Sequence, residues 1–276
     1  MQLKSALLQA TQLLEQGAIA SPRLTAELLL CHALSRDRAW LHAHSDEPLS
    51  EVAWIHFGRY LHERLNGKPL QHITHRQEFY GRQFRVTPDV LIPRPETEHV
   101  IEVALRRAPN ARRAIDIGCG SGALAVTWAL ETTAKVFATD ISLPALTIAR
   151  ENAQALHAPV HFLATHLASA LQPASFDLVL SNPPYIPDTE RESLQREVRD
   201  HEPPVALYGG PTGVEIYQPL IADAARILRP GGSLVMEIGY QAQERVRAML
   251  DPHFTGFEVD HDLAGWPRVV SACYSP

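Results

Sequence analysis

The heptapeptide Asp116-Ile117-Gly118-Cys119-Gly120-Ser121-Gly122 decides how the larger part of this 276-residue chain is interpreted. It continues the apolar run that begins at 113 and precedes a helical pattern over residues 123–131, which predicts a strand, a tight turn and a helix. Glycines in such a turn let the backbone approach a ligand, because no Cβ intervenes. The alternative is that they serve only the close packing of the helix on the strand.

A carboxylate at the end of the next predicted strand favours the ligand-binding interpretation. Asp140 ends the run over 135–140, 18 residues after Gly122, where a carboxylate can accept both hydroxyl protons of a ribose. The Gly-x-Gly-x-Gly spacing differs from the Gly-x-Gly-x-x-Gly associated with a pyrophosphate, and no P-loop motif occurs. S-adenosylmethionine has ribose hydroxyls but no phosphate, so we expect this cofactor rather than NAD.

The second half of the chain alternates strand-like runs with helical patterns. The strand-like runs cover 113–118, 135–140, 160–164, 176–181, 232–238, 254–260 and 268–274, and helical patterns include 143–156 and 214–228. Apolar strands separated by helices predict an α/β fold with a mainly parallel sheet that is covered on both faces. Ligands of such folds bind at the carboxyl ends of the strands.

The first 67 residues instead repeat apolar side chains at helical spacing. Ser21 before Pro22 predicts the N-cap of one helix. Ser50 predicts the cap of another helix over 51–65, which Asn66-Gly67 ends. This part of the chain is therefore expected to be helical.

A short β-hairpin is predicted between the two halves, over residues 78–90. Phe79 and Phe84 stand there among polar residues, and Gly81 and Pro88 punctuate the run.

The motif Asn182-Pro183-Pro184-Tyr185 follows the predicted strand over 176–181. Two prolines stop the strand and stiffen the backbone, so that the asparagine and tyrosine side chains project from a rigid corner. The Asn182 carboxamide oxygen and the Pro183 carbonyl can accept two protons from a planar amide or amino group, and the Tyr185 ring offers a face for stacking. The constellation favours a substrate with an –NH2 group over a simple turn with an exposed tyrosine.

Composition narrows the class of protein. Hydrophobic residues make up 45% of the chain and charged ones 20%, as in globular proteins. The formal net charge is −6, and residues 1–90 hold ten Lys and Arg against nine Asp and Glu. Broad electrostatic binding to nucleic acid is therefore disfavoured, and an enzyme acting on DNA would be expected to carry a sizeable basic region.

Cysteine usage and hydropathy bear on the compartment. The three cysteines Cys31, Cys119 and Cys273 are far apart and form no Cys-x-x-Cys pair, which is typical of a reducing compartment. No run approaches 18 apolar residues, so we expect no membrane span and a cytoplasmic protein. The fourteen histidines include no His-Glu-x-x-His motif, so no metal site is expected.

The glycine loop, Asp140 and the Asn-Pro-Pro-Tyr motif occur together in this chain, which resembles the peptide chain release factor glutamine methyltransferases. The Asn-Pro-Pro-Tyr motif alone is the signature of amino-group methyltransferases and is shared with enzymes that methylate adenine in DNA. Its combination with the run Leu-Ile-Pro-Arg-Pro-Glu-Thr-Glu at 91–98 is far more specific. The supporting matches cover 78–81, 91–98, 116–122, 176–186, 202–207 and 237–239.

The resemblance implies methyl transfer from S-adenosylmethionine to the side-chain amide nitrogen of the glutamine in the Gly-Gly-Gln motif of release factors. It implies a class I, Rossmann-like methyltransferase domain with a seven-stranded sheet over 93–276. A hairpin linker over 76–92 would join this domain to an N-terminal helical domain over 1–75 that docks the release factor. The alternatives are an enzyme acting on another protein glutamine or on adenine in nucleic acid, and a binding module that retains the fold without activity.

The resemblance also implies roles for individual residues. Asn182, Pro183, Pro184 and Tyr185 would hold the substrate glutamine, with Asn182, Pro183 and Tyr185 as the catalytic set. Where the family often has an acidic and then an aromatic residue beside the adenine, this chain has His166 and Leu167. The cofactor would contact Asp116, Gly118, Cys119, Gly120, Ser121, Gly122, Asp140, Leu167 and Asn182.

Three further groups have alternative interpretations. The residues Arg94 to Glu98 either cap a helix that begins after Pro95 or contact the methionine end of the cofactor. Asp116 and Glu237 each end a strand, where they either accept a hydrogen bond from a helix N-terminus or anchor the cofactor, and we favour the anchor only for Asp116. Cys119 has no identifiable histidine partner, which argues against a nucleophilic role.

Overall fold

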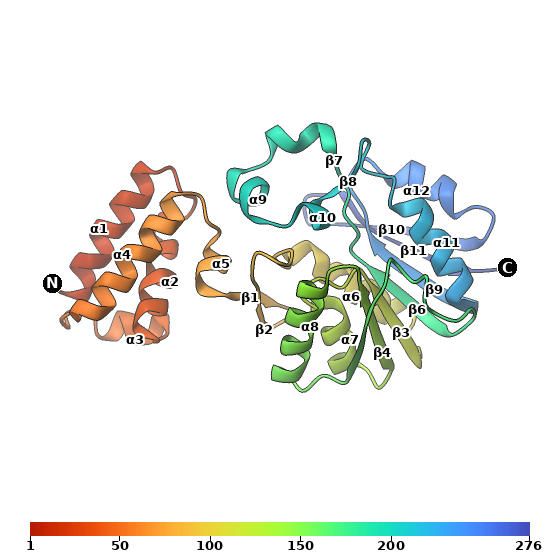
Figure 1. Cartoon of the computed structure of the whole chain (residues 1–276), viewed down its shortest axis with the longest axis horizontal. Helices are drawn as coiled ribbons and strands as arrows, with labels where there is room; N and C mark the ends of the chain where they lie inside the picture. Colours follow the sequence, from red (N-terminus) through yellow and green to blue (C-terminus); the bar gives the residue numbers. More distant parts are fainter. The chain divides into compact units, whose positions relative to one another are not determined.

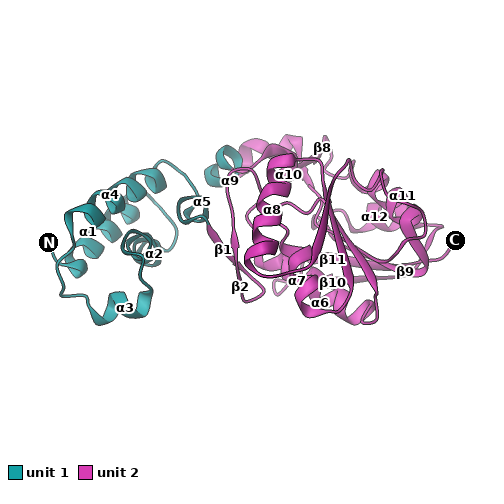
Figure 2. Ribbon diagram, turned by 60° about the horizontal axis from the view of Figure 1, so that its bottom comes forward, with its two compact units in different colours: residues 1–75, 195–201 teal, residues 76–194, 202–276 magenta.

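The computed structural model describes residues 1–276, which form two compact units (Figure 2). The helical unit comprises residues 1–75 and 195–201, and the α/β unit comprises residues 76–194 and 202–276. The polypeptide thus leaves the α/β unit once, contributes a short helix to the helical unit, and returns.

The helical unit packs apolar faces of its helices around one core. Its helices are α1 (Leu3–Gln16), α2 (Pro22–Leu34), α3 (Arg38–Ala43), α4 (Glu51–Leu65), α5 (Leu70–Thr74) and α9 (Arg196–His201). The core includes Leu14, Leu29 and Phe57, which are fully buried. Helix α9 is tied to α4 by an ion pair of 2.6 Å between Glu197 and Arg64, whose side chain is largely buried.

The two predicted helix starts in this unit have different outcomes. The Ser50 side chain accepts a hydrogen bond from the Ala53 amide at 3.3 Å, so the cap of α4 is confirmed. The predicted cap at Ser21 is wrong, because Ser21 caps no amide although α2 does begin at Pro22. Ser21 has φ 49° and ψ 55°, whereas a capping side chain needs an extended backbone to reach back over the first turn.

The α/β unit is built on a seven-stranded sheet, as expected. Its strands are β3 (Arg113–Ile117), β4 (Lys135–Asp140), β5 (Val160–Ala164), β6 (Phe176–Ser181), β9 (Leu228–Glu237), β10 (Phe254–His261) and β11 (Pro267–Tyr274). The spatial order is β10-β11-β9-β6-β3-β4-β5. Strands β3, β4, β5, β6 and β9 are parallel, while β11 and β10 are antiparallel additions at one edge.

Helices cover both faces of this sheet (Figure 1). The helices are α6 (Glu98–Arg107), α7 (Ala123–Glu131), α8 (Leu143–Ala155), α11 (Tyr217–Ile227) and α12 (Gln243–Leu250). In β3, Ala114 packs in the core with α6, α7 and α8, whereas Ile115 and Ile117 pack in the core with α11 and α12. The strand is apolar on both faces because both are buried.

The hairpin consists of β1 (Arg76–Phe79) and β2 (Arg82–Arg85), so its second strand ends earlier than the expected residue 90. Phe79 and Phe84 meet edge to face, with ring centroids 6.0 Å apart, in the core of the α/β unit. The Asn152 side chain of α8 bonds the backbone N–H and C=O of Arg85 at 2.7 and 3.0 Å. The hairpin is thereby fastened to the α/β unit.

The remaining elements are short. They are the 3₁₀ helices η1 (Pro95–Thr97) and η2 (Asp188–Ser193), the helix α10 (Pro204–Leu207) and the short parallel strands β7 (Ile186–Pro187) and β8 (Tyr208–Gly210). No helix of the protein has both the length and the apolar character needed to cross a membrane. All three cysteines are free thiols.

Candidate active site

One pocket of the α/β unit lies at the carboxyl ends of β3, β4 and β6, where the order of the sheet reverses. Such a switch point opens a crevice because the connections on its two sides run to opposite faces of the sheet. Neither Gly122 nor Tyr185 lines the pocket. The other residues that the sequence assigned to the site all line it: Asp116, Gly118, Cys119, Gly120, Ser121, Asp140, Leu167, Asn182, Pro183 and Pro184.

Two glycines of the loop after β3 serve different purposes. Gly120 has φ 52°, and a Cβ added there would meet no atom within 4 Å, so its backbone faces open space. Gly122 has φ 82°, and a Cβ there would lie 3.2 Å from the Ala149 Cβ of α8. Gly120 therefore leaves room for a ligand, whereas Gly122 allows close packing of the helices.

Asp140 organises the loop as well as facing the pocket. Its Oδ2 accepts the Gly120 amide and its Oδ1 accepts the Ser142 amide, both at 2.8 Å. Each carboxylate oxygen has two lone pairs, so both oxygens can accept a further proton from a ligand. The geometry fits the two adjacent hydroxyls of a ribose.

Asp116 is a buried carboxylate with one free oxygen. Its side chain is 1% exposed, and Oδ2 accepts the Ala125 amide of α7 at 3.1 Å. Oδ1 has no partner in the protein. Burial raises the pKa of Asp116 from 3.8 to about 7, and the Asp140 charge adds to the increase. A cationic group in the pocket would satisfy Oδ1 and favour the ionised form.

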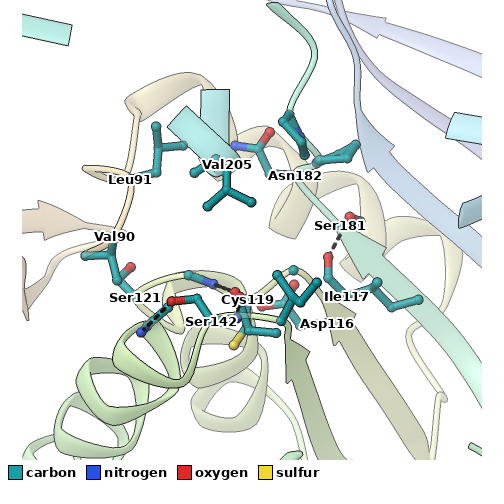
Figure 3. A pocket seen from close by; sticks show the side chains of 18 of the residues that line it. Val90, Leu91, Asp116, Ile117, Cys119, Ser121, Ser142, Ser181, Asn182 and Val205 are labelled. Atoms are coloured by element: carbon teal, nitrogen blue, oxygen red, sulfur yellow. Dashed lines mark hydrogen bonds between the residues drawn. The ribbon is translucent and has the colours of Figure 1, made fainter. Parts of the chain in front are cut away.

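The Asn-Pro-Pro corner follows β6 directly. The Ser181 hydroxyl donates to the Ile117 carbonyl at 2.7 Å and so joins the ends of β6 and β3. Asn182 Nδ2 donates to Thr97 Oγ1 at 3.1 Å, and Asn182 Oδ1 has no donor in the protein. Figure 3 shows Asn182 and Val205 across the open space from Asp116 and Cys119.

Tyr185 is turned toward β9 and is anchored there. Its hydroxyl donates to Glu237 Oε1 at 2.9 Å, and its ring packs close to Gly239. Burial and the neighbouring Glu237 carboxylate hold the pKa of Tyr185 well above its usual range. The hydroxyl therefore stays protonated and donates a hydrogen bond at neutral pH.

A loop and the start of helix α10 form the apolar side of the pocket opposite the glycine loop. One contributes Val90, Leu91 and Pro93, and the other contributes Pro203, Val205 and Ala206. Glu202, 3% exposed, joins the segments, since it accepts the Ile92 amide at 3.0 Å and Arg94 Nη2 at 2.5 Å. Arg94 and Glu202 thus pair with each other across the two segments.

His166 and Leu167 both line the pocket at the end of β5, and Ile141 lines it beside them. The Ile141 side chain is 59% exposed and directly follows Asp140. An apolar surface beside the Asp140 carboxylate suits the face of a purine. The sequence reasoning overlooked Ile141, although its position immediately after Asp140 was a usable signal.

Residues 5–74 match the PrmC N-terminal domain family, and residues 98–198 match the methyltransferase small domain family. A release factor glutamine methyltransferase of Koribacter versatilis is 44% identical over 98% of both chains. The chain belongs to the release factor glutamine methyltransferase family. A second relative of that name, from Nitratidesulfovibrio vulgaris, is 42% identical over 98% of this chain and 94% of its own.

Solved structures confirm the methyltransferase fold for this member of the release factor glutamine methyltransferase family. A methyltransferase of Pyrococcus furiosus superposes with a TM-score of 0.56, at 17% identity, over 79% of this chain and all of its own. The 16S rRNA N2 G1207 methyltransferase of T. thermophilus, solved with AdoMet and guanosine, has a TM-score of 0.52 at 21% identity, over 73% of this chain and 50% of its own.

Side chains of the family motif at 91–98 contact distant segments of the chain. No side chain from Arg94 to Glu98 caps η1 or α6, so the capping interpretation is wrong. Arg94 pairs with Glu202, Glu98 accepts the Tyr80 amide at 2.8 Å, and only Thr97 reaches the pocket. Residues 94–98 instead stabilise the wall of the pocket, because their side chains bond to distant segments rather than to the helix that follows.

Glu237 is neither a helix cap nor part of the pocket wall. It accepts Thr97 Oγ1 at 2.6 Å and the Tyr185 hydroxyl. In this member of the release factor glutamine methyltransferase family, the sequence pointed to Thr97 as a helix cap or a cofactor contact but not to its bonds with Asn182 and Glu237, since these partners lie on other segments of the chain. No cluster of three His, Cys, Asp or Glu side chains is arranged to hold a metal ion.

Proposed function

We propose that this protein transfers a methyl group from S-adenosylmethionine to the side-chain amide nitrogen of the glutamine in the Gly-Gly-Gln motif of peptide chain release factors. One observation carries the proposal. A single pocket combines a ribose-type carboxylate, Asp140, with the uncharged acceptor Asn182 Oδ1, in a chain that matches release factor glutamine methyltransferases over nearly its whole length.

The residues of the pocket fit the cofactor. Asp140 can accept the ribose hydroxyls, and the unpartnered Asp116 Oδ1 can accept the ammonium of the methionine end. The open face of Gly120 leaves room for the cofactor, and the apolar side chains of Ile141 and Leu167 suit the adenine. When bound, S-adenosylmethionine supplies an electrophilic methyl group on a sulfonium that is also a good leaving group.

Two oxygen atoms of the Asn-Pro-Pro corner can offset the weak nucleophilicity of an amide nitrogen. An amide nitrogen is a poor nucleophile because its lone pair is delocalised, with a rotation barrier of roughly 18–20 kcal/mol. Asn182 Oδ1 and the Pro183 carbonyl can accept both protons of the substrate –NH2 and so aim its nitrogen. The same oxygens stabilise positive charge that develops on that nitrogen.

No general base is needed before the transfer. The methylated amide is acidic enough to lose its extra proton to water afterwards. Tyr185 does not serve as a base either, because its hydroxyl donates to Glu237 and its pKa is raised. Catalysis on this account consists of positioning and electrostatic stabilisation.

The helical unit, we propose, helps to hold the release factor. Two features support this: the match of residues 5–74 to the PrmC N-terminal domain and the exposed apolar side chains of Leu8, Val52 and Ile55. Exposed apolar side chains on a small unit are available to a protein partner.

Mass spectrometry of a release factor incubated with the full chain and labelled S-adenosylmethionine tests the function. The expected result is a mass increase of one methylene group on the Gly-Gly-Gln peptide, with a lower KM for the intact factor than for the isolated peptide. Labelling of a ribosomal protein or of adenine in DNA, with none on the release factor, would contradict the proposal.

Cofactor affinity should depend on pH through Asp116. The folded protein without ligand holds this carboxyl protonated up to a pKa of about 7, whereas the unfolded chain ionises it near 3.8. The group's contribution to stability therefore falls as pH rises from 3.8 to 7. Since binding an ammonium requires the ionised form, affinity should rise about fivefold from pH 6 to pH 7 and about tenfold in all from pH 6 to a plateau above pH 8. Calorimetric titration should show this slope in the wild type and lose it in Asp116→Asn; an equal slope in both would refute the assignment.

A further inference from the structure

Four polar side chains from three segments form a hydrogen-bonded chain behind the pocket. Asn182 Nδ2 donates to Thr97 Oγ1 at 3.1 Å, and Thr97 Oγ1 donates to Glu237 Oε2 at 2.6 Å. The Tyr185 hydroxyl donates to Glu237 Oε1 at 2.9 Å. Thr97 is 4% exposed and Glu237 is 1% exposed. Two of the four belong to the Asn-Pro-Pro-Tyr corner, and the other two lie outside it.

The direction of the hydrogen bonds follows from chemistry rather than from which amide atom is drawn as nitrogen. An ionised carboxylate only accepts, so the single proton of each hydroxyl is committed to Glu237. Thr97 Oγ1 can then only accept from Asn182. The –NH2 end of the Asn182 carboxamide must face Thr97, and its oxygen must face the pocket.

We propose that Thr97 and Glu237 are positioning residues that determine which end of the Asn182 carboxamide faces the substrate. Either orientation of an asparagine side chain occupies nearly the same space, so packing alone does not choose between them. The inference rests on the proposed function, in which Asn182 Oδ1 accepts a proton of the substrate amide. With the carboxamide reversed, two –NH2 groups would face each other and the substrate nitrogen would be repelled.

The charge state of Glu237 decides whether the hydrogen bonds run from Asn182 through Thr97 to Glu237. A protonated Glu237 could donate to Thr97, which would then be free to donate to Asn182 Oδ1 and reverse the carboxamide. Burial raises the pKa of Glu237, while the two hydroxyl donors lower it. Among the charged groups facing it, Arg268 of β11 favours the ionised form and Glu96 of η1 disfavours it.

One more titratable group faces this carboxylate. Tyr217 of α11 accepts the Gly239 amide at 3.1 Å, and burial raises its pKa, so it remains neutral. Glu237 is therefore the group in this cluster whose protonation should lower the rate of methyl transfer as the pH falls. Methyl transfer should accordingly decline in acid with an apparent pKa above that of an ordinary glutamate.

Isosteric and conservative substitutions at Thr97 test the proposal. Thr97→Val keeps the shape but removes the hydroxyl, and Thr97→Ser keeps the hydroxyl. At saturating cofactor and release factor, kcat should fall about tenfold in Thr97→Val and stay within about twofold of the wild type in Thr97→Ser. Thr127→Val is the matched control, because Thr127 is a fully buried threonine of α7 whose hydroxyl has no partner; its kcat should be unchanged. A wild-type kcat in Thr97→Val, or equal losses in the serine and valine variants, would overturn the proposal.

The pH profile gives a second test, which does not depend on the folding of Thr97→Val. Saturating cofactor removes the contribution of Asp116, so the acid limb of kcat should report Glu237. The limb should be absent in Glu237→Gln, which has no carboxyl to titrate; a limb that persists in this variant would count against the proposal.

An NMR titration gives a readout independent of turnover. The side-chain amide signals of Asn182, assigned by their loss in Asn182→Asp, should shift with pH in the wild type and not in Thr97→Val. Signals that titrate equally in both proteins would refute the proposed role of Thr97 and Glu237. A wild type that leaves the release factor unmethylated but shows the expected titration would refute the proposed function alone.

Discussion

Replacing Asn182 by alanine is expected to slow methyl transfer about 10²-fold at saturating cofactor and release factor. The reason is that Asn182 Oδ1 is a preorganised acceptor in the pocket, and the substitution removes it while Thr97 keeps its bond to Glu237. By analogy with the loss of one oxyanion-hole donor, the transition state should lose about 3 kcal/mol. Single-turnover methylation followed by mass spectrometry measures the rate of the step itself.

The control for Asn182→Ala separates catalysis from folding. Asn66, an exposed asparagine at the end of α4 that bonds only His62, offers a matched substitution, Asn66→Ala, which should leave the rate unchanged. The thermal unfolding temperature of Asn182→Ala should also stay near that of the wild type. A single-turnover rate close to the wild-type value would mean that the Asn182 oxygen does not act in the transition state.

Asp140→Ala is expected to weaken cofactor binding about 10²-fold or more. Each hydrogen bond between a charged and a neutral group contributes roughly 1.5–3 kcal/mol, and the ribose would lose two acceptors. The substitution also leaves the Gly120 and Ser142 amides without their acceptor, which loosens the loop beneath the ligand. Isothermal titration calorimetry with S-adenosylhomocysteine measures the dissociation constant directly.

Asp177→Ala is the matched control for Asp140→Ala. The Asp177 carboxylate also accepts two backbone amides, those of Arg112 and Arg113, at 2.9 Å each. It stands at the start of β6, at the opposite end of the strands from the pocket. Asp177→Ala should reduce stability and leave the dissociation constant unchanged. Equal weakening in both variants would show that Asp140 acts only through the stability of the fold.

The local sequence predicted the strands of the sheet well. Both faces of β3 and β6 are buried, so apolar residues stand at adjacent positions, as in Ala114-Ile115 and Leu178-Val179-Leu180, and a glycine or proline follows soon after each run. The helix starts were harder, as Ser21 shows, because the same serine-proline pair is compatible with a left-handed residue before the helix. A short pattern carries the preference of a residue but not the backbone angle that the surrounding structure imposes.

The candidate site was predictable to the extent that its residues lie next to one another in the chain. The glycine loop, Asp140 and the Asn-Pro-Pro corner all follow directly from strand ends, and carboxyl ends of parallel strands share one edge of a sheet. Tyr185 was recognised with its corner, but its hydroxyl points to Glu237 rather than into the pocket. The side on which a side chain leaves a stiff loop depends on what packs against the loop.

The sequence alone was enough to predict the family, the order of the strands and helices, and the segments that carry the chemistry. These features depend on motifs and spacings within a few residues. Only the tertiary structure decided that Thr97 bonds both Asn182 and Glu237, and that Glu202 joins the segments around Ile92 and Arg94. These contacts join residues 85 to 140 positions apart. Hydrogen bonds over such separations exist only where the packing of the sheet and its connections brings donor and acceptor within about 3 Å.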